Sequence, residues 1–205
     1  MKTRIASFLL LGLALAALPA SAQILYSNGP FNGTVDAWTI NFGYVVSDTF
    51  TVSSAVTISG FDIWVWEFPG DQALTVDWSI TTKEFGGRVA GSGTATVADS
   101  FISVNQYGYD MDKLTVSGLH VHVPAGTYWL NLENATTDQG NPLYWDENSG
   151  PSEASENALG TLPSEAFDLT GSSGSTTGGQ SPEPSSILLF GSGMLAAAGL
   201  LRRMR

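Results

Sequence analysis

Short alternations of apolar and polar residues, interrupted by turn-forming amino acids, restrict the fold of this chain more than any other feature. In Leu74–Thr81 every second residue is apolar, and Tyr128–Glu133 repeats this period. A period of two places the apolar side chains of a strand on one face. One dry face and one wet face are typical of strands in antiparallel sheets.

The fold is therefore expected to be all-β, because no segment between the two chain ends has an apolar period of 3.6 residues. Many short strands separated by Gly, Asn, Asp, Ser and Pro predict an antiparallel β-sandwich. The predicted strands are Tyr44–Val52, Val56–Trp66, Leu74–Thr81, Ser92–Val97, Lys113–Val116, Gly126–Asn134 and Phe167–Leu169. In the second of these, Trp64 and Trp66 lie opposite an apolar face, so this strand is either covered on both sides or presents two tryptophans outward.

The first 22 residues have the three regions of a secretory signal peptide. Two basic residues precede an apolar run, Ile5–Leu18, and Pro19 ends that run. Ala20 and Ala22 form a small-residue cleavage site, so the mature chain is predicted to begin at Gln23. The alternative is an uncleaved membrane anchor, for which the apolar run is short.

The last 25 residues, 181–205, combine a proline-rich motif, an apolar run and a basic end. The run, Ile187–Leu201, would form roughly 22 Å of helix at about 1.5 Å per residue, which is short for a bilayer core of about 30 Å. We expect a short transmembrane helix with a cytoplasmic C-terminus, by the positive-inside rule. A buried core helix is the alternative. The motif and the basic cluster are Pro182, Glu183, Pro184, Arg202, Arg203 and Arg205.

In this order and position, the three features resemble the PEP-CTERM sorting signal of exopolysaccharide-producing Gram-negative bacteria. The resemblance implies processing near the motif by an exosortase, a membrane enzyme, after transient anchoring in the inner membrane. It also implies delivery to the cell surface or the extracellular matrix, for example of a biofilm. The expected organisation is a signal peptide (1–22), an ectodomain (23–170), a Gly/Ser-rich linker (171–180) and the sorting signal (181–205).

The ectodomain also resembles a recurrent domain of proteins with such tails. This resemblance implies a jelly-roll-like sandwich and no activity. The stretches that carry it are Val46–Phe50, Gly60–Trp64, Ala125–Leu130, Tyr144–Asn148 and Ser164–Leu169.

The segment between the two ends is strongly acidic. It holds 18 of the 19 acidic residues but only three of the eight basic ones, Lys83, Arg88 and Lys113. Such a surface repels nucleic acid and anionic lipid. Cysteine is absent, so disulfides and thiol chemistry are excluded.

Two groups of residues suggest ligands. The first is a set of hard oxygen donors in one predicted loop, suited to a structural Ca²⁺, for which the alternative is a solvated acidic loop. The second is a platform of flat aromatic faces beside polar groups, suited to sugar rings, for which the alternative is ordinary burial of the tryptophans. The calcium candidates are Asp138, Asn141, Asp146, Glu147 and Asn148. The carbohydrate candidates are Trp64, Trp66, Trp129, Asp62, Asn131 and Glu133.

No constellation points to catalysis. His120 and His122 lie two residues apart, as a metal site would need, but the chain has no third histidine. No G-x-S-x-G motif occurs, and no pair of carboxylates is distinguished from the rest. We therefore expect an exported surface or matrix protein without catalytic activity or cofactor. A carbohydrate-binding module and a secreted hydrolase are the alternatives.

Overall fold

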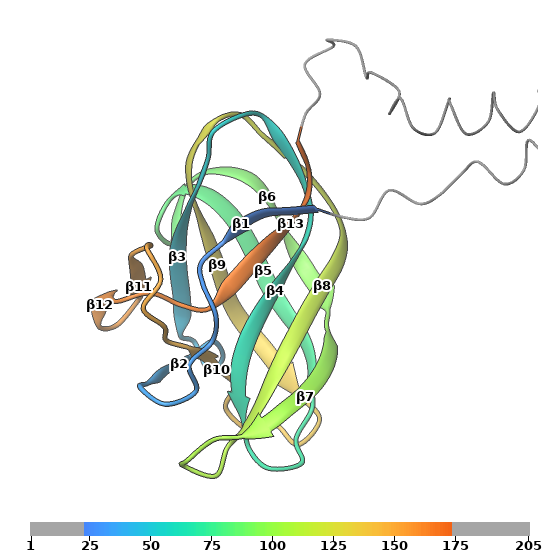
Figure 1. Cartoon of the computed structure of the whole chain (residues 1–205), viewed down its shortest axis with the longest axis vertical. Coiled ribbons are helices and arrows are strands. Elements are labelled where there is room, and N and C mark those ends of the chain that lie inside the picture. The colour runs from blue at the N-terminus through green and yellow to red at the C-terminus, as the bar shows by residue number, and fades with distance from the viewer. Residues whose placement is uncertain (1–22, 174–205) are drawn as a thin grey trace, which may run out of the picture. The chain divides into compact units, whose positions relative to one another are not determined.

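The computed structural model describes residues 23–173, which form two antiparallel sheets packed face to face as a β-sandwich (Figure 1). The first sheet, sheet A, contains β1 (Gln23–Ser27), β2 (Ala37–Thr39), β4 (Val56–Glu67), β7 (Ala98–Val104), β8 (Asp110–Val123), β10 (Tyr144–Asp146) and β13 (Phe167–Ser173). The second, sheet B, contains β3 (Val45–Val52), β5 (Ala73–Lys83), β6 (Gly86–Thr96), β9 (Gly126–Thr137), β11 (Ala154–Glu156) and β12 (Gly160–Leu162). The predicted all-β sandwich is confirmed.

Strand β4 is the centre of sheet A. It pairs with β8 along one edge and with β13 and then β10 along the other, while β7 extends the sheet beyond β8 and β1 extends it beyond β13. Sheet B has the order β12-β11-β3-β9-β5-β6. Consecutive strands often lie in different sheets, so most pairings join distant parts of the sequence.

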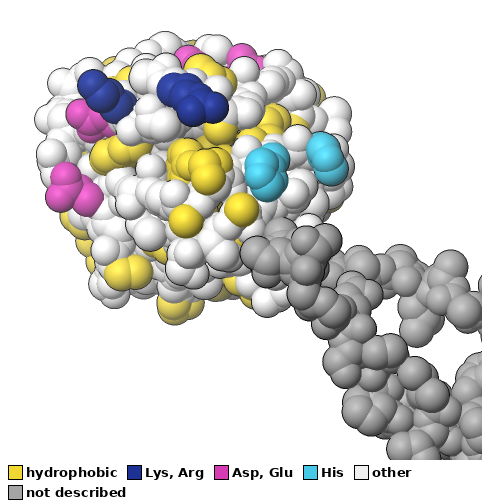
Figure 2. Space-filling view, turned by 90° about the horizontal axis from the view of Figure 1, so that it is seen from above, with side chains coloured by type: hydrophobic (Ala, Val, Ile, Leu, Met, Phe, Trp, Pro, Cys, Tyr) yellow, Lys and Arg dark blue, Asp and Glu magenta, His cyan; other side chains and the backbone are white. Residues whose placement is uncertain are grey.

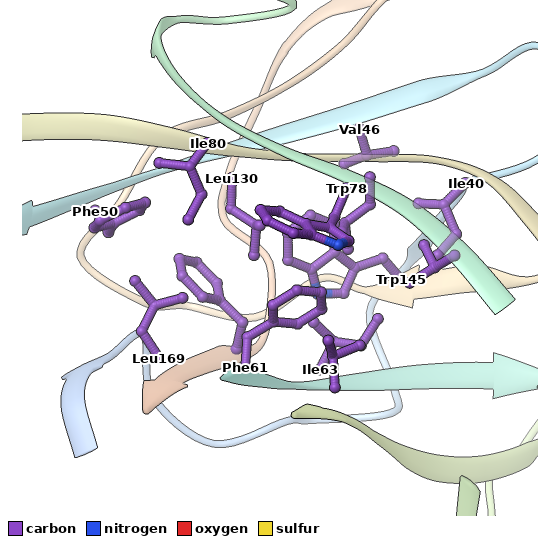
Figure 3. Packing of buried hydrophobic residues seen from close by; sticks show 14 of the residues in the cluster. Ile40, Val46, Phe50, Phe61, Ile63, Trp78, Ile80, Leu130, Trp145 and Leu169 are labelled. Atoms are coloured by element: carbon purple, nitrogen blue, oxygen red, sulfur yellow. The ribbon is translucent and has the colours of Figure 1, made fainter. Parts of the chain in front are cut away.

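The core fills the space between the sheets with the apolar faces that the alternation predicts. Phe61, Ile63 and Val65 from β4 are fully buried, and Leu130 and Leu132 from β9 face them from sheet B. Figure 3 shows such aliphatic and aromatic side chains interleaving between the two layers. Burial of these side chains is the main stabilising contribution to folding.

One apolar residue departs from the predicted pattern. Leu74 was expected on the core face of its strand, but its side chain is 47% exposed. The pairing of β5 with β9 is irregular between Ala73 and Asp77, and Ala73 is buried instead. Because side chains alternate strictly, one extra residue in a strand exchanges the faces before and after it.

Several strand boundaries also differ from the predicted ones. Strand β8 is much longer than the predicted Lys113–Val116, because it pairs with β4 along almost its whole length. Strand β13 continues to Ser173 by pairing with Val56 and Thr57, so the predicted linker loses its first three residues. The sequence did not predict β1, β2, β7, β10, β11 or β12, several of which have only three residues.

The predicted signal peptide (1–22), the remainder of the linker and the predicted sorting signal lie outside the described residues. Within residues 23–173 there is no helix long and apolar enough to cross a membrane.

Candidate functional site

The predicted calcium ligands at the end of β10 are already engaged in hydrogen bonds. The carboxylate of Asp146 accepts from the Trp66 indole Nε1 (2.6 Å) and from the backbone N–H groups of Asn32 and Gly33 (2.9 Å each). Burial raises the pKa of Asp146, although these donors oppose the shift. Glu147 Oε2 accepts from the Trp38 indole (3.0 Å).

The next residue, Asn148, has the same kind of role. Its Nδ2 donates to the carbonyl oxygens of Asn28 (2.9 Å) and Pro30 (3.2 Å), and its Oδ1 accepts from Gly150 N (3.0 Å) and the Ser164 hydroxyl (2.9 Å). This arrangement satisfies buried polar groups. Residues 146–148 therefore fasten the segment after β1 to β10.

The other two predicted ligands, Asp138 and Asn141, make hydrogen bonds in the segment that follows β9. Asp138 accepts from Gln72 N (3.1 Å), and the backbone N–H of Asn141 donates to Thr137 Oγ1 (3.0 Å). In the part of the chain that the structure describes, the carboxylate oxygens of Asp138, Asp146 and Glu147 do not all lie within 4.8 Å of one another. The structure does not bring the predicted calcium ligands together.

A different set of carboxylates does converge. Glu67 at the end of β4, Asp99 on β7 and Asp112 on β8 each offer an oxygen within 4.8 Å of the others. The pKa of Glu67 is raised to about 9 by burial and by the neighbouring acids Asp99, Asp112 and Asp71. The pKa of Asp112 is raised to about 7, again chiefly by burial. We call Glu67, Asp99 and Asp112 the carboxylate cluster.

The alternation of side chains along each strand indicates that two members of the carboxylate cluster face the core. Glu67 has the same strand parity as Phe61, Ile63 and Val65, and Asp112 has the parity of Leu114. A carboxylate at a core-facing position of a strand is unusual, because an unpaired buried charge is costly.

A second set of buried polar residues, centred on Asp48, lies inside the sandwich. Asp48 accepts hydrogen bonds from Asn28 Nδ2 (3.1 Å), Glu165 N (2.7 Å) and Thr49 N (2.5 Å). Burial raises the pKa of Asp48 to about 7. Glu165 is fully buried, neither of its carboxylate oxygens has a hydrogen-bond partner, and burial followed by the charge of Asp48 raises its pKa well above the ordinary value.

The predicted carbohydrate platform is divided between the two sheets. Trp64 and Trp66 lie on β4 in sheet A, whereas Trp129 lies on β9 in sheet B. Trp66 is only 6% exposed, because the rings of Tyr107 and Tyr109 pack against it. These three tryptophans do not form one surface.

The half-buried tryptophans have different surroundings. Trp64 stacks on Phe31 (centroids 6.2 Å apart), and Asp62 beside it forms an ion pair with Lys113 (3.0 Å). Asn131, two residues from Trp129, is buried: its Nδ2 donates to Thr81 Oγ1 and its Oδ1 accepts from Ser47 Oγ.

Glu133, the last of the predicted platform residues, is half-buried on β9 in sheet B, where its strand neighbours are Val45 and Asp77. It therefore lies on the sheet that carries Trp129 and not on the sheet of Trp64 and Trp66.

An open pocket of about 380 Å³ lies at Phe42, which sequence reasoning did not single out. The Phe42 side chain is 65% exposed, and its backbone has φ = 56°, a conformation that non-glycine residues rarely adopt. Asn134, also at positive φ (49°), lines the same pocket with Asn41, Thr136 and Thr137. The pocket thus combines an exposed aromatic ring with amides and hydroxyls.

The two histidines lie on β8 with both side chains exposed, as Figure 2 shows for the only two imidazoles of the chain. They are not part of a group of three or more metal-binding residues among those described.

Residues 23–173 thus define an antiparallel β-sandwich with enclosed carboxylates and one amide-lined pocket. No protein-family model matches the chain, and no curated protein matches it. The PEP-CTERM resemblance stays a prediction.

Proposed function

We propose that this chain is an exported, non-catalytic protein of the cell surface or extracellular matrix, released from the membrane by an exosortase. The observation that carries the proposal is the pairing of Gln23 with Gly171 on β1 and β13. Gln23 is the predicted first residue of the mature chain, and Gly171 precedes the sorting signal by ten residues. Cleavage at both predicted sites would leave every described strand pairing intact.

The position of the acidic residues supports binding rather than hydrolysis. Glu67, Asp48 and Glu165, whose pKa values are raised, are all fully buried and so are out of reach of a polymer. The residues that line the Phe42 pocket include no acid and no base. General acid-base catalysis needs such a group within hydrogen-bonding reach of the substrate.

The strand order supports a jelly roll as the finer description of the sandwich. If the edge strand β7 and the three-residue strands β2, β10, β11 and β12 are set aside, the eight others in chain order are arranged 1-8-3-6 in one sheet and 2-7-4-5 in the other. This is the order that two successive Greek keys produce when a long hairpin folds over itself.

Processing at the two ends tests the proposed function. We expect the exported form to begin at Gln23 and to lack Arg202–Arg205, as measured by mass spectrometry. Replacing Arg202, Arg203 and Arg205 with glutamate should block sorting, because the basic end keeps the tail in the cytoplasm. Exported material with an intact C-terminus, or normal release of the triple variant, would refute exosortase processing.

Carbohydrate binding is a second candidate function, and the Phe42 pocket favours it. Flat aromatic rings stack on apolar sugar faces, while amides and hydroxyls bond sugar hydroxyl groups. An exposed phenylalanine held at positive φ has a backbone cost that its own packing does not offset, which is a common property of ligand-binding positions. The ligand class would be a neutral polysaccharide, since no charged group lines the pocket.

We expect Phe42→Ala to weaken binding to purified exopolysaccharide about tenfold, the equivalent of about 1.4 kcal/mol. Its melting temperature should change little, because the side chain is exposed. Phe101→Ala is the matched control, since Phe101 is similarly exposed (60%) on β7. Trp64→Ala and Trp129→Ala test the two halves of the predicted platform. Equal binding by the Phe42 and Phe101 variants would exclude this pocket.

A further inference from the structure

The carboxylate cluster lies at one end of the sandwich, between the sheets. Figure 1 shows the end of β4 beside β7 and the start of β8. The strand register agrees, because Asp112 pairs with Val65 of β4 on one side and with Phe101 of β7 on the other. Three strands of sheet A therefore direct one carboxylate each toward a common point.

The cluster lacks the partners that buried carboxylates ordinarily have. Glu67 is fully buried, and neither Oε1 nor Oε2 has a hydrogen-bond partner. Asp99 Oδ2 accepts from Ala73 N (3.0 Å), but Asp99 Oδ1 is buried without a partner. The one ion pair found among residues 23–173 joins Lys113 to Asp62, so no described cation neutralises the cluster. Leaving buried charge unpaired in this way costs several kcal/mol.

We propose that Glu67, Asp99 and Asp112 bind one divalent metal ion, for which Ca²⁺ is the best fit. The three side chains supply up to six oxygens, the ligand atoms that Ca²⁺ prefers, and no sulfur or imidazole. Oxygens around one Ca²⁺ at about 2.4 Å are separated by at most about 5 Å, which agrees with the 4.8 Å limit on the cluster.

A fourth carboxylate lies near the cluster, outside the group of oxygens that are within 4.8 Å of one another. Asp71, in the turn between β4 and β5, is nearly buried and has one oxygen, Oδ2, without a partner. Its charge contributes to the raised pKa of Glu67, so it lies close to the cluster. The bound ion would connect the end of β4 to β7 and β8, and so fasten the edge of sheet A.

The competing explanation is that the carboxyl groups are simply protonated at neutral pH. The raised pKa values of Glu67 and Asp112 are what burial without a counter-ion produces, and they agree with either explanation. The two explanations differ in their response to Ca²⁺. Protonated carboxyl groups gain nothing from the ion, whereas a metal site is stabilised by it.

Calcium titration of the full chain decides between the two. We expect one Ca²⁺ per chain by calorimetry and a melting temperature higher by about 5–10 °C in Ca²⁺ at about 100 times the dissociation constant than in EDTA. Glu67→Gln should abolish both effects. This isosteric variant should melt above the wild type in EDTA, because buried Glu67 must take up a proton to fold without the ion and glutamine does not. Asp112→Asn is the second test variant.

Two controls complete the design. Glu153→Gln removes an exposed carboxylate and should leave both effects unchanged. Glu147→Gln tests the calcium loop predicted from the sequence and should likewise retain binding. If the wild type neither binds Ca²⁺ nor melts higher with it, or if Glu67→Gln and Asp112→Asn bind as the wild type does, the metal site is excluded and the cluster is a protonated structural group.

Discussion

Trp145→Ala is expected to lower the free energy of unfolding by about 3–5 kcal/mol, a large part of the total stability of about 5–15 kcal/mol that is usual for a domain. Trp145 is fully buried on β10, where it meets Phe167 edge to face (centroids 5.7 Å apart). Figure 3 shows its indole in the centre of the core, beside Trp78. Truncation leaves a cavity that the surrounding strands cannot close.

Trp145→Phe separates packing from hydrogen bonding. The Trp145 Nε1 donates to the carbonyl oxygen of Ala166 (2.8 Å), which also accepts from Trp64 N (3.3 Å). Phenylalanine retains most of the apolar volume, so we expect a loss of only about 1–2 kcal/mol. Denaturant unfolding measures both variants. A Trp145→Ala protein as stable as the wild type would mean that β10 is not part of the core.

The domain is expected to lose stability as the pH rises from 5 to 8, by about 2–3 kcal/mol from Asp48 alone. Burial raises the pKa of Asp48 from 3.8 to about 7, so between these values the folded protein binds a proton that the unfolded chain does not. The stabilisation is complete below about pH 4 and is lost as the pH rises through about 7.

Glu165, which faces Asp48, reinforces this direction, because it is fully buried and its pKa is also raised. Burial and the Asp48 charge raise the pKa of Tyr26 to about 12, so its hydroxyl stays protonated between pH 5 and 8 and does not contribute. Asn28 and Ser152, which also contact this group, are neutral.

Thermal melts at pH 5 and pH 8 in EDTA measure the effect. Asp48→Asn should reduce the dependence on pH, although it also disturbs the hydrogen bonds that Asp48 accepts. Glu84→Gln, which removes an exposed carboxylate, is the control and should keep the wild-type dependence. Stability that rises with pH in the wild type would contradict the prediction.

The chemistry of the interior was only partly visible in the sequence. Asp48 occupies a core-facing position of the predicted strand Tyr44–Val52, so its burial follows from the same alternation that identified the core, whereas Glu67 lies one residue beyond the predicted strand Val56–Trp66 and keeps its core-facing parity. The partners of each acid do not follow. Asp99 and Asp112 reach Glu67 only because β7 and β8 pair beside β4, although Asp99 is 32 positions from Glu67 in the chain.

The sequence by itself determined the all-β class, the core faces of β4, β5 and β9, and the acidic character of the domain. These properties are local, because side-chain alternation is set by backbone geometry within one strand. Only the tertiary structure decided where Trp64, Trp66 and Trp129 lie, which donors the Asp146 carboxylate accepts hydrogen bonds from, and which carboxylates converge. Strand pairing across distant segments, and bulges such as the one near Leu74, depend on the packing of both sheets together, which no single stretch of sequence specifies.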